Sequence, residues 1–298
     1  MKKKILSIGE IIWDVYPEKK TIGGAPMNFA AHAVRCGADC FLISAIGNDE
    51  LGENAIRELR DFGVNCEFIK RNEKSTGQCI VTLDEKAIPH YNVLSDAAYD
   101  YISLEDSDYD KINQEHFDAF YFGTLVQRNL TSRNAVSDLI NKCRFPNIVC
   151  DVNLRPNCYD VESVQICLNH ATILKVSIEE EPILRLFGGY APKSESPKSV
   201  AVALCEKYSQ LEIVILTLGK EGSYAYIAKD QKEYRQKAIG DSVVSTVGAG
   251  DSFTAAWLIS YLDQKPMELC MEKAAEISGF VVAHTEAIPF YCSQDFDN

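Results

Sequence analysis

The chain has 298 residues, of which 46% are hydrophobic and 24% charged, and this balance is that of an ordinary globular protein with a large core. Its net charge of −13 argues against binding to nucleic acid or to an anionic membrane surface, because both require clustered positive charge. The eleven cysteines include no Cys-x-x-Cys pair and lie mostly in apolar stretches, which indicates reduced thiols and a cytoplasmic location.

Short apolar runs alternate with segments of helical period along most of the chain. Such alternation is typical of β-α units around a mostly parallel sheet, so the predicted fold class is α/β. The apolar run at 252–262 is shorter than the roughly 20 residues that cross a bilayer. In chain order, we predict strands at 5–8, 40–46, 119–122, 148–152, 172–176 and 213–218, and helices at 26–36, 51–62, 251–262 and 267–284.

Two segments, 11–22 and 76–101, are strand-like and lack a helical period. The part at 76–94 has the pattern of two strands around the turn Asp84-Glu85-Lys86. Strands that do not fit the β-α alternation can form a small separate sheet, and we expect this sheet to be a lid over the active site. No linker or repeat divides the chain, so residues 1–298 are predicted to form a single domain. The acidic cluster at 105–110 is interpreted as a solvated loop.

The most informative motif is Gly248-Ala249-Gly250-Asp251, at the start of the predicted helix 251–262. The first N–H groups of a helix lack internal partners and carry the positive end of its dipole, so a turn without large side chains offers them to an anion. With an acid that can accept a hydroxyl proton, this arrangement suits phosphoryl transfer. The alternative is a purely structural turn with Asp251 near the helix start. The motif is neither a Walker A loop nor Gly-x-Gly-x-x-Gly.

A second group of residues, near the N-terminus, suits the binding of a polyol. Gly23-Gly24 precedes the predicted helix 26–36, and bare backbone there lets a ligand approach closely. Asp14 and Asn28 offer a carboxylate and an amide, which are natural partners for sugar hydroxyls. A tight turn leading into a helix is the structural alternative for the two glycines.

Polar residues also follow three predicted strands, and ligands bind at the carboxyl ends of strands in open α/β sheets. Arg155 follows the strand 148–152, and a surface ion pair is its alternative role. Glu180 follows the strand 172–176 and could hold hydrated Mg²⁺ or simply start a helix. The end of the strand 213–218 and the glycine turn after it suit the approach of a nucleotide phosphate, and they contain Thr217, Gly219 and Gly222.

Together these motifs resemble the ribokinase-like (PfkB) carbohydrate kinases, and in particular their fructokinase branch. The likeness follows the family's order over nearly the whole chain, and the combination of its first and last motifs is highly specific. The motifs are Gly23-Gly24-x-x-x-Asn28, Ile46 to Gly52, Phe122-Gly123, Asp151 to Pro156, Lys175 to Glu180, Thr217-Leu218-Gly219 and Gly248 to Asp251.

The resemblance implies a Rossmann-like three-layer fold with a β-sheet lid that often forms a dimer contact. It also implies ATP-dependent phosphorylation of a primary hydroxyl of a sugar, with ATP and the sugar as the binding partners. In this reading Asp251 is the catalytic base, Gly248, Ala249 and Gly250 form the anion hole, Asp14, Gly24, Asn28 and Arg155 bind the sugar, Lys175, Thr217 and Gly219 lie near the nucleotide, and Glu180 is linked to Mg²⁺.

Fructose is the expected substrate. Ribose, 2-keto-3-deoxygluconate or a nucleoside remain alternatives within the same mechanism, and a non-catalytic sugar-binding protein on a kinase fold is the alternative from another class. Ser245 and Glu286 depart from the family's pattern around a monovalent cation, which leaves activation by K⁺ an open question. His284 is interpreted either as a residue near the adenine or as part of the packing.

Overall fold

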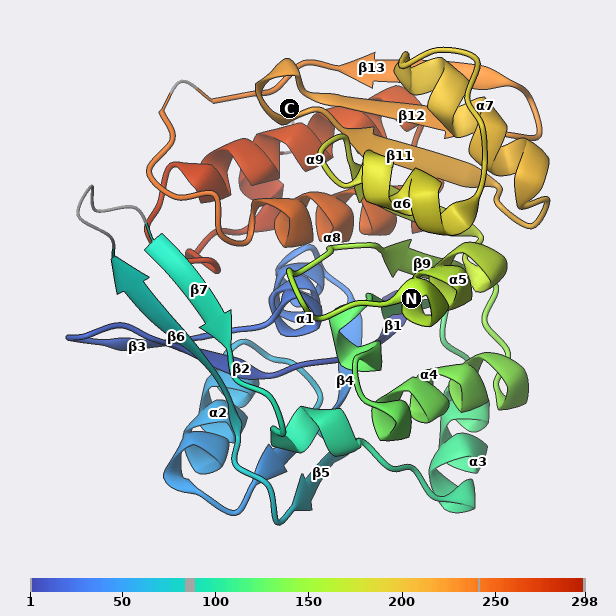
Figure 1. Ribbon diagram of the computed structural model, residues 1–298. Coiled ribbons are helices and arrows are strands. Elements are labelled where there is room, and N and C mark those ends of the chain that lie inside the picture. Colours follow the sequence, from blue (N-terminus) through green and yellow to red (C-terminus); the bar gives the residue numbers. More distant parts are fainter. Residues whose placement is uncertain (1, 84–88, 241, 297–298) are drawn as a thin grey trace.

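A mostly parallel central sheet organises the molecule (Figure 1). The computed structural model describes residues 2–83, 89–240 and 242–296. Within these residues the central sheet has nine strands in the order β13-β12-β11-β10-β9-β8-β1-β4-β5. They are β1 (Lys4–Ile8), β4 (Asp39–Gly47), β5 (Ile69–Asn72), β8 (Ala119–Phe122), β9 (Ile148–Asp151), β10 (Ile173–Ser177), β11 (Ile213–Thr217), β12 (Ser223–Ile227) and β13 (Lys232–Gln236).

All strands from β11 to β5 pair in parallel, whereas β12 and β13 pair antiparallel at one edge. The six strands predicted from the sequence are confirmed, with ends that agree within one residue. The prediction missed β5, β12 and β13. The two edge strands β5 and β13 are partly exposed, so they lack the continuous apolar run that marks a buried parallel strand.

Helices cover both faces of this sheet and make it the middle of three layers (Figure 1). Side chains alternate between the faces along each strand: in β1, Leu6 and Ile8 belong to one core cluster and Ile5 to the other. The first cluster packs under α3 (Asp106–Glu115), α4 (Leu130–Lys142), α5 (Val161–His170), α6 (Glu181–Gly188) and α7 (Pro197–Lys207). The second packs under α1 (Ala25–Arg35), α2 (Glu50–Asp61), α8 (Ala249–Leu262) and α9 (Met267–Val282).

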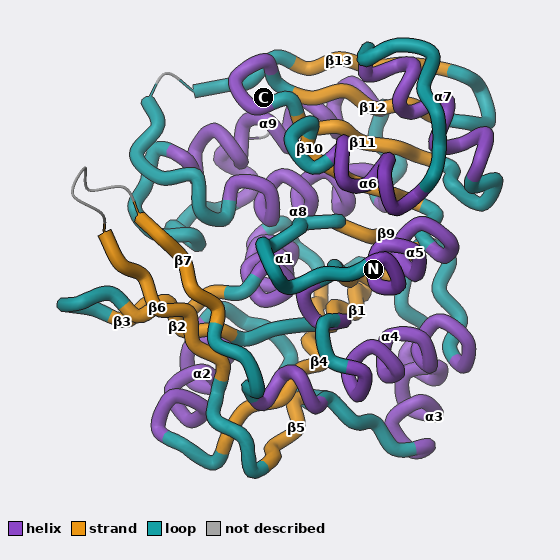
Figure 2. Tube along the Cα trace, viewed as in Figure 1, coloured by secondary structure: helices purple, strands orange, loops and turns teal. Residues whose placement is uncertain are grey.

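The separate small sheet expected from the sequence is also present, beside the central sheet (Figures 1 and 2). Its order is β3-β2-β6-β7, with a parallel pairing of β2 and β6 between two antiparallel pairs. The predicted turn at 84–86 lies outside the described residues. The strands are β2 (Ile12–Val15), β3 (Lys20–Gly23), β6 (Gly77–Leu83) and β7 (Pro89–Val93).

Two details of the sequence prediction are wrong. The strand-like segment ends before residues 98–101, which form the 3-10 helix η1 (Ala98–Tyr101). The Ala97 amide donates to the Asp100 carboxylate and the Asp100 amide donates to the Ala97 carbonyl, each over 2.9 Å, and these local bonds close the turn. The acidic cluster at 105–110 is a helix start rather than a loop. Glu105 and Asp108 form a capping box there, and acids are stabilised at this end of a helix.

No helix in the described ranges has the length and apolar character needed to cross a membrane. Among the same residues the eleven cysteines form no disulfide.

Candidate active site

Asp251 lies at the start of α8, where the sequence motif predicted an anion pocket. The helix begins at Ala249, and Gly248 caps it with φ 82°. The amide of Ala249, which was predicted as part of the anion hole, donates instead to the carbonyl oxygen of Thr246 over 3.3 Å. No acceptor for the amide N–H groups of Gly250 and Asp251 is found in the part of the chain that the structure describes. Two unpaired amides at a helix N-terminus form a site for a negatively charged group.

Asn28 on α1 holds the Asp251 carboxylate in place. Its Nδ2 donates to Oδ2 of Asp251 over 2.9 Å, and both side chains are buried. Burial raises the pKa of Asp251 to about 6, and the hydrogen bond from Asn28 opposes this shift. A carboxylate with a pKa near neutrality is a suitable general base.

The glycines of the motif are required by close contacts. A Cβ on Gly248 would lie 2.4 Å from the carbonyl oxygen of Ala287, and its positive φ also favours glycine. A Cβ on Gly250 would lie 2.9 Å from Nζ of Lys175. The ammonium group of Lys175 is therefore immediately beside the predicted anion hole.

Lys175 reaches this position through a buried ion pair with Asp151 of the neighbouring strand. Its Nζ lies 3.0 and 2.9 Å from the two carboxylate oxygens. Burial alone would lower the pKa of Lys175, but the carboxylates of Asp151 and Glu180 outweigh it and raise the pKa. The lysine, predicted near the nucleotide, is thus a fixed positive charge under the start of α8.

Asp14, Gly24 and Glu10 lie on the side of the site predicted to bind the sugar. Burial raises the pKa of Asp14 to about 6, and Arg155 together with a hydrogen bond from the Cys79 thiol opposes the rise. Gly24 has φ 112°, and a Cβ there would lie 2.3 Å from the carbonyl oxygen of Glu10. The Glu10 carboxylate accepts from the amide of the residue after Gly24 over 3.1 Å, and burial raises its pKa to about 7.

Arg155 lies in the exposed loop after β9. Its charge lowers the pKa of Asp14, Glu10 and Asp251, although burial dominates each shift. The structure therefore brings the predicted residues of both sides, Asp14 and Arg155 on one and Asp251 on the other, within electrostatic reach.

Glu180 joins the ends of two strands. One oxygen accepts from the amide of Leu154 over 2.6 Å and the other from the amide of Ser177 over 2.8 Å. A carboxylate has further lone pairs after accepting these two bonds, so the residue fits a hydrated Mg²⁺ held through water. The described ranges contain no cluster of three His, Cys, Asp or Glu side chains for direct metal ligation.

The three residues predicted around the nucleotide turn have different surroundings. Thr217 pairs with Ser177 in the sheet, and Gly219 faces Glu179, so both lie beside the Glu180 segment. Gly222 instead closes the turn, because a Cβ there would lie 2.0 Å from the carbonyl oxygen of Gln236. A nucleotide contact of Gly222 stays a prediction.

His32 is a supporting residue that the sequence reasoning missed. It is fully buried on α1, and its Nε2 lies 2.9 Å from the carbonyl oxygen of Ala287 and its Nδ1 2.8 Å from the hydroxyl of Tyr291. A carbonyl only accepts, so Nε2 carries the hydrogen and Tyr291 donates to Nδ1. Burial lowers the pKa of His32 to about 4, which keeps the ring neutral.

Helix α1 therefore supports the phosphate side twice, one turn apart. Asn28 binds Asp251, and His32 binds Ala287, which backs Gly248. The spacing of four residues, which places both on one helix face, is the signal that could have found His32. His284, in contrast, packs within its own helix end, with Nδ1 2.7 Å from the carbonyl oxygen of Phe280.

The sequence profile of the pfkB family carbohydrate kinases matches residues 2–292. The chain belongs to this family. An ATP-dependent 6-phosphofructokinase of Thermoanaerobacterium thermosaccharolyticum is 26% identical over 96% of this chain and 90% of its own. A sugar kinase of Pyrococcus horikoshii is 30% identical over 94% of this chain and 88% of its own. The structure of that kinase with ATP matches this fold with a TM-score of 0.77, covering 98% and 96% of the two chains. An Arabidopsis thaliana protein named as a probable fructokinase is 26% identical over 86% of this chain and 82% of its own.

As a pfkB carbohydrate kinase, the chain is a phosphotransferase that uses ATP and an alcohol group as acceptor. The relatives are named for different sugars, so the family alone leaves the acceptor sugar open.

Proposed function

We propose that this kinase phosphorylates the primary hydroxyl of fructose by direct in-line transfer from ATP, with Asp251 as the base. One observation carries the proposal: a buried carboxylate with a pKa of about 6 lies next to the unpaired amides of Gly250 and Asp251. An acceptor hydroxyl and a phosphoryl group that meet at this point find the proton acceptor and the charge stabilisation together.

In the proposed step, the sugar oxygen forms a bond to the γ-phosphorus while its proton passes to Asp251. The bond to the departing ADP breaks, and the amides of Gly250 and Asp251 stabilise the negative charge of the transferred group. The Lys175 ammonium, which lies beside Gly250, stabilises the same negative charge. Because such transition states are loose, the proton leaves late and positioning supplies most of the rate.

Mg²⁺ is proposed to accompany the nucleotide near Glu180, held through its water shell. When bound, the ion neutralises charge on the phosphate oxygens. Thr217 and Gly219 are proposed to contact the nucleotide, since they adjoin this segment. A requirement for K⁺ at the loop of Ser245 and Glu286 is checked by omitting the salt from the same assay.

On the sugar side, Asp14, Gly24, Asn28 and Arg155 are proposed to bind the hydroxyl groups. The carboxylates of Glu10, Asp14 and Asp251 have pKa values raised by burial, with Arg155 as the opposing cation that their shifts share. An excess of buried acids disfavours an acid sugar or a sugar phosphate, so this charge balance supports a neutral sugar such as fructose.

We also propose that the small sheet is the lid, because Asp14 is one of its residues. Closure would exclude water, which protects ATP from hydrolysis. Residues 1–298 are proposed to form one domain, and the protein to act in the cytoplasm. A dimer through the small sheet, which the family resemblance implies, is checked by analytical sedimentation.

A panel of sugars with ATP and Mg²⁺, followed by coupled ADP release, tests the proposal. Fructose should give the highest kcat/KM, above ribose, nucleosides, 2-keto-3-deoxygluconate and fructose 6-phosphate. A higher value for an anionic sugar would contradict the charge argument. Saturable sugar binding without ADP formation would favour a non-catalytic sugar-binding protein.

A further inference from the structure

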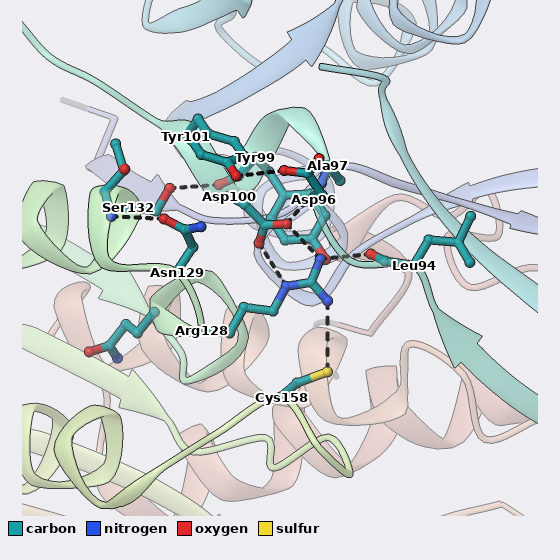
Figure 3. Close-up of polar contacts among 12 residues, drawn as sticks. Leu94, Asp96, Ala97, Tyr99, Asp100, Tyr101, Arg128, Asn129, Ser132 and Cys158 are labelled. Carbon is teal, nitrogen blue, oxygen red and sulfur yellow. Dashed lines mark hydrogen bonds and ion pairs between the residues drawn. The ribbon is translucent and has the colours of Figure 1, made fainter.

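The small sheet meets the main body at a largely buried group of four residues, Tyr99, Asp100, Arg128 and Cys158, which we call the hinge cluster (Figure 3). Arg128 is its centre. Its Nε lies 2.7 Å from Oδ1 of Asp100 and its Nη2 2.8 Å from Oδ2, in a bidentate pair. The guanidinium also lies 4.9 Å from the centre of the Tyr99 ring. Such a planar group holds several partners in fixed directions.

The hinge cluster contacts both ends of the β6–β7 hairpin. Nη2 of Arg128 donates to the carbonyl oxygen of Leu94, the residue after β7, over 2.7 Å. The Tyr99 ring packs on Gly77, the first residue of β6, so closely that a Cβ on Gly77 would lie 2.8 Å from Cε1. The chain therefore contacts the hinge cluster both where the hairpin begins and where it ends.

The cluster also holds the loop that carries Arg155. Nη1 of Arg128 contacts Sγ of Cys158 at 3.8 Å, and the Cys158 amide donates to the carbonyl oxygen of Arg155 over 2.9 Å. At the start of this loop, the Thr124 hydroxyl donates to the carbonyl oxygen of Val152 over 2.8 Å. One short segment, 124–128, thus supports both ends of the loop.

We propose that Arg128 is a positioning residue for the sugar: it fixes the small sheet, with Asp14, relative to the loop with Arg155. The inference rests on the proposed sugar kinase function. Arg128 acts through other residues, because four of its five N–H donors bond to Asp100, Leu94 and Cys158. Asp14 and Arg155 belong to different segments of the chain, so a sugar that binds both depends on their spacing.

The test compares Arg128→Met, Arg128→Lys and Cys158→Ala in the fructose assay. In Arg128→Met the KM for the sugar should rise about tenfold or more, while kcat and the KM for ATP change less than about twofold. Arg128→Lys should show a smaller rise, because the ammonium keeps the charge but not the planar fork. Cys158→Ala should show the smallest rise.

Arg185→Met is the matched control. Arg185 forms a bidentate pair with the buried Glu181 of its own helix, as Arg128 does with Asp100, and its second pair is with Glu195, so its loss should lower the melting temperature and leave the sugar KM unchanged. If Arg128→Met lowers the melting temperature but keeps the wild-type sugar KM, or lowers kcat instead, the proposal is overturned. Should Arg128→Met fail to fold, the Lys and Ala variants decide by the same criteria.

Calorimetric titration with fructose separates this inference from the proposed function. Weaker sugar binding by Arg128→Lys than by the wild type supports the role of Arg128 even if no ADP forms. Equal binding overturns it while the kinase activity stands. A wild type that binds no sugar overturns both.

Discussion

The proposed phosphate side and the proposed sugar side of this site are formed by different kinds of structural element. Asp251 and its neighbouring amides start a buried helix, and α1 fixes them through Asn28 and His32. Asp14 and Arg155, in contrast, lie on a small sheet and an exposed loop that meet at the hinge cluster. The difference teaches that the groups proposed for the chemistry are held by buried helices, whereas those proposed to bind the sugar belong to less buried parts of the chain, where residues can vary more freely.

Replacing Asp251 tests the rigid side most severely. Asp251→Asn has the same size, but the amide cannot accept the hydroxyl proton. We expect kcat to fall about 10³-fold, with the KM values for sugar and ATP within about threefold of the wild type. Steady-state kinetics by coupled ADP release measures this. Turnover within about tenfold of the wild type would remove Asp251 from the role of base.

Gly248→Ala tests whether the cap of α8 must keep its backbone. The added Cβ would meet the Ala287 carbonyl oxygen at a residue with φ 82°, so the amides should shift and kcat should fall about 10²-fold. Gly189→Ala is the control, since Gly189 also has a positive φ but its Cβ would meet only the flexible end of Lys207. It should cost about 1 to 2 kcal/mol of stability and leave kcat unchanged; equal losses of kcat would contradict the assignment.

His32→Leu tests the second support of α1. Without the bond to Ala287, the segment behind Gly248 should loosen, and we expect kcat to fall about tenfold with an unchanged sugar KM. His32→Gln should recover part of this loss, because its amide can donate as Nε2 does. Tyr291→Phe should have a smaller effect. A change in the sugar KM at constant kcat would show that His32 supports the sugar side of the site and not the phosphate side.

The smallest expected effect is a shift in pH dependence. Asp251 must be ionised to accept a proton, so kcat should fall as the pH drops through its pKa of about 6. The bond from Asn28 lowers that pKa, and Asn28→Ala should therefore move the acidic limb of the kcat profile to higher pH. A limb that stays in place or moves down would show that another group controls it.

The features that could be predicted from the sequence are those that neighbouring residues determine. Gly248 to Asp251 could be placed because a helix start is set by neighbouring residues, and the small sheet because its segments lack a helical period. Contacts between residues that lie far apart in the sequence could not be predicted in this way. The ion pair of Lys175 with Asp151 depends on the parallel register that sets the two residues opposite each other, and no local pattern reveals that register.

The same limit applies to supporting residues. Asn28 was chosen for the sugar, and its bond to Asp251 spans 223 positions. Arg128 lies between predicted elements with nothing nearby to mark it, because its partners come from two distant segments, 94–100 and the loop that ends at Cys158. Such residues become visible only when packing has brought the segments together.

The parallel pairing of β2 with β6 has a consequence for engineering. The small sheet consists of two antiparallel strand pairs from separate parts of the chain. If only one of these pairs were replaced by that of a relative with another acceptor sugar, β2 and β6 would come from different proteins, and their side chains would not match where the two strands pair. Exchange of acceptor preference between relatives should therefore succeed only when 12–23 and 77–93 are transplanted together.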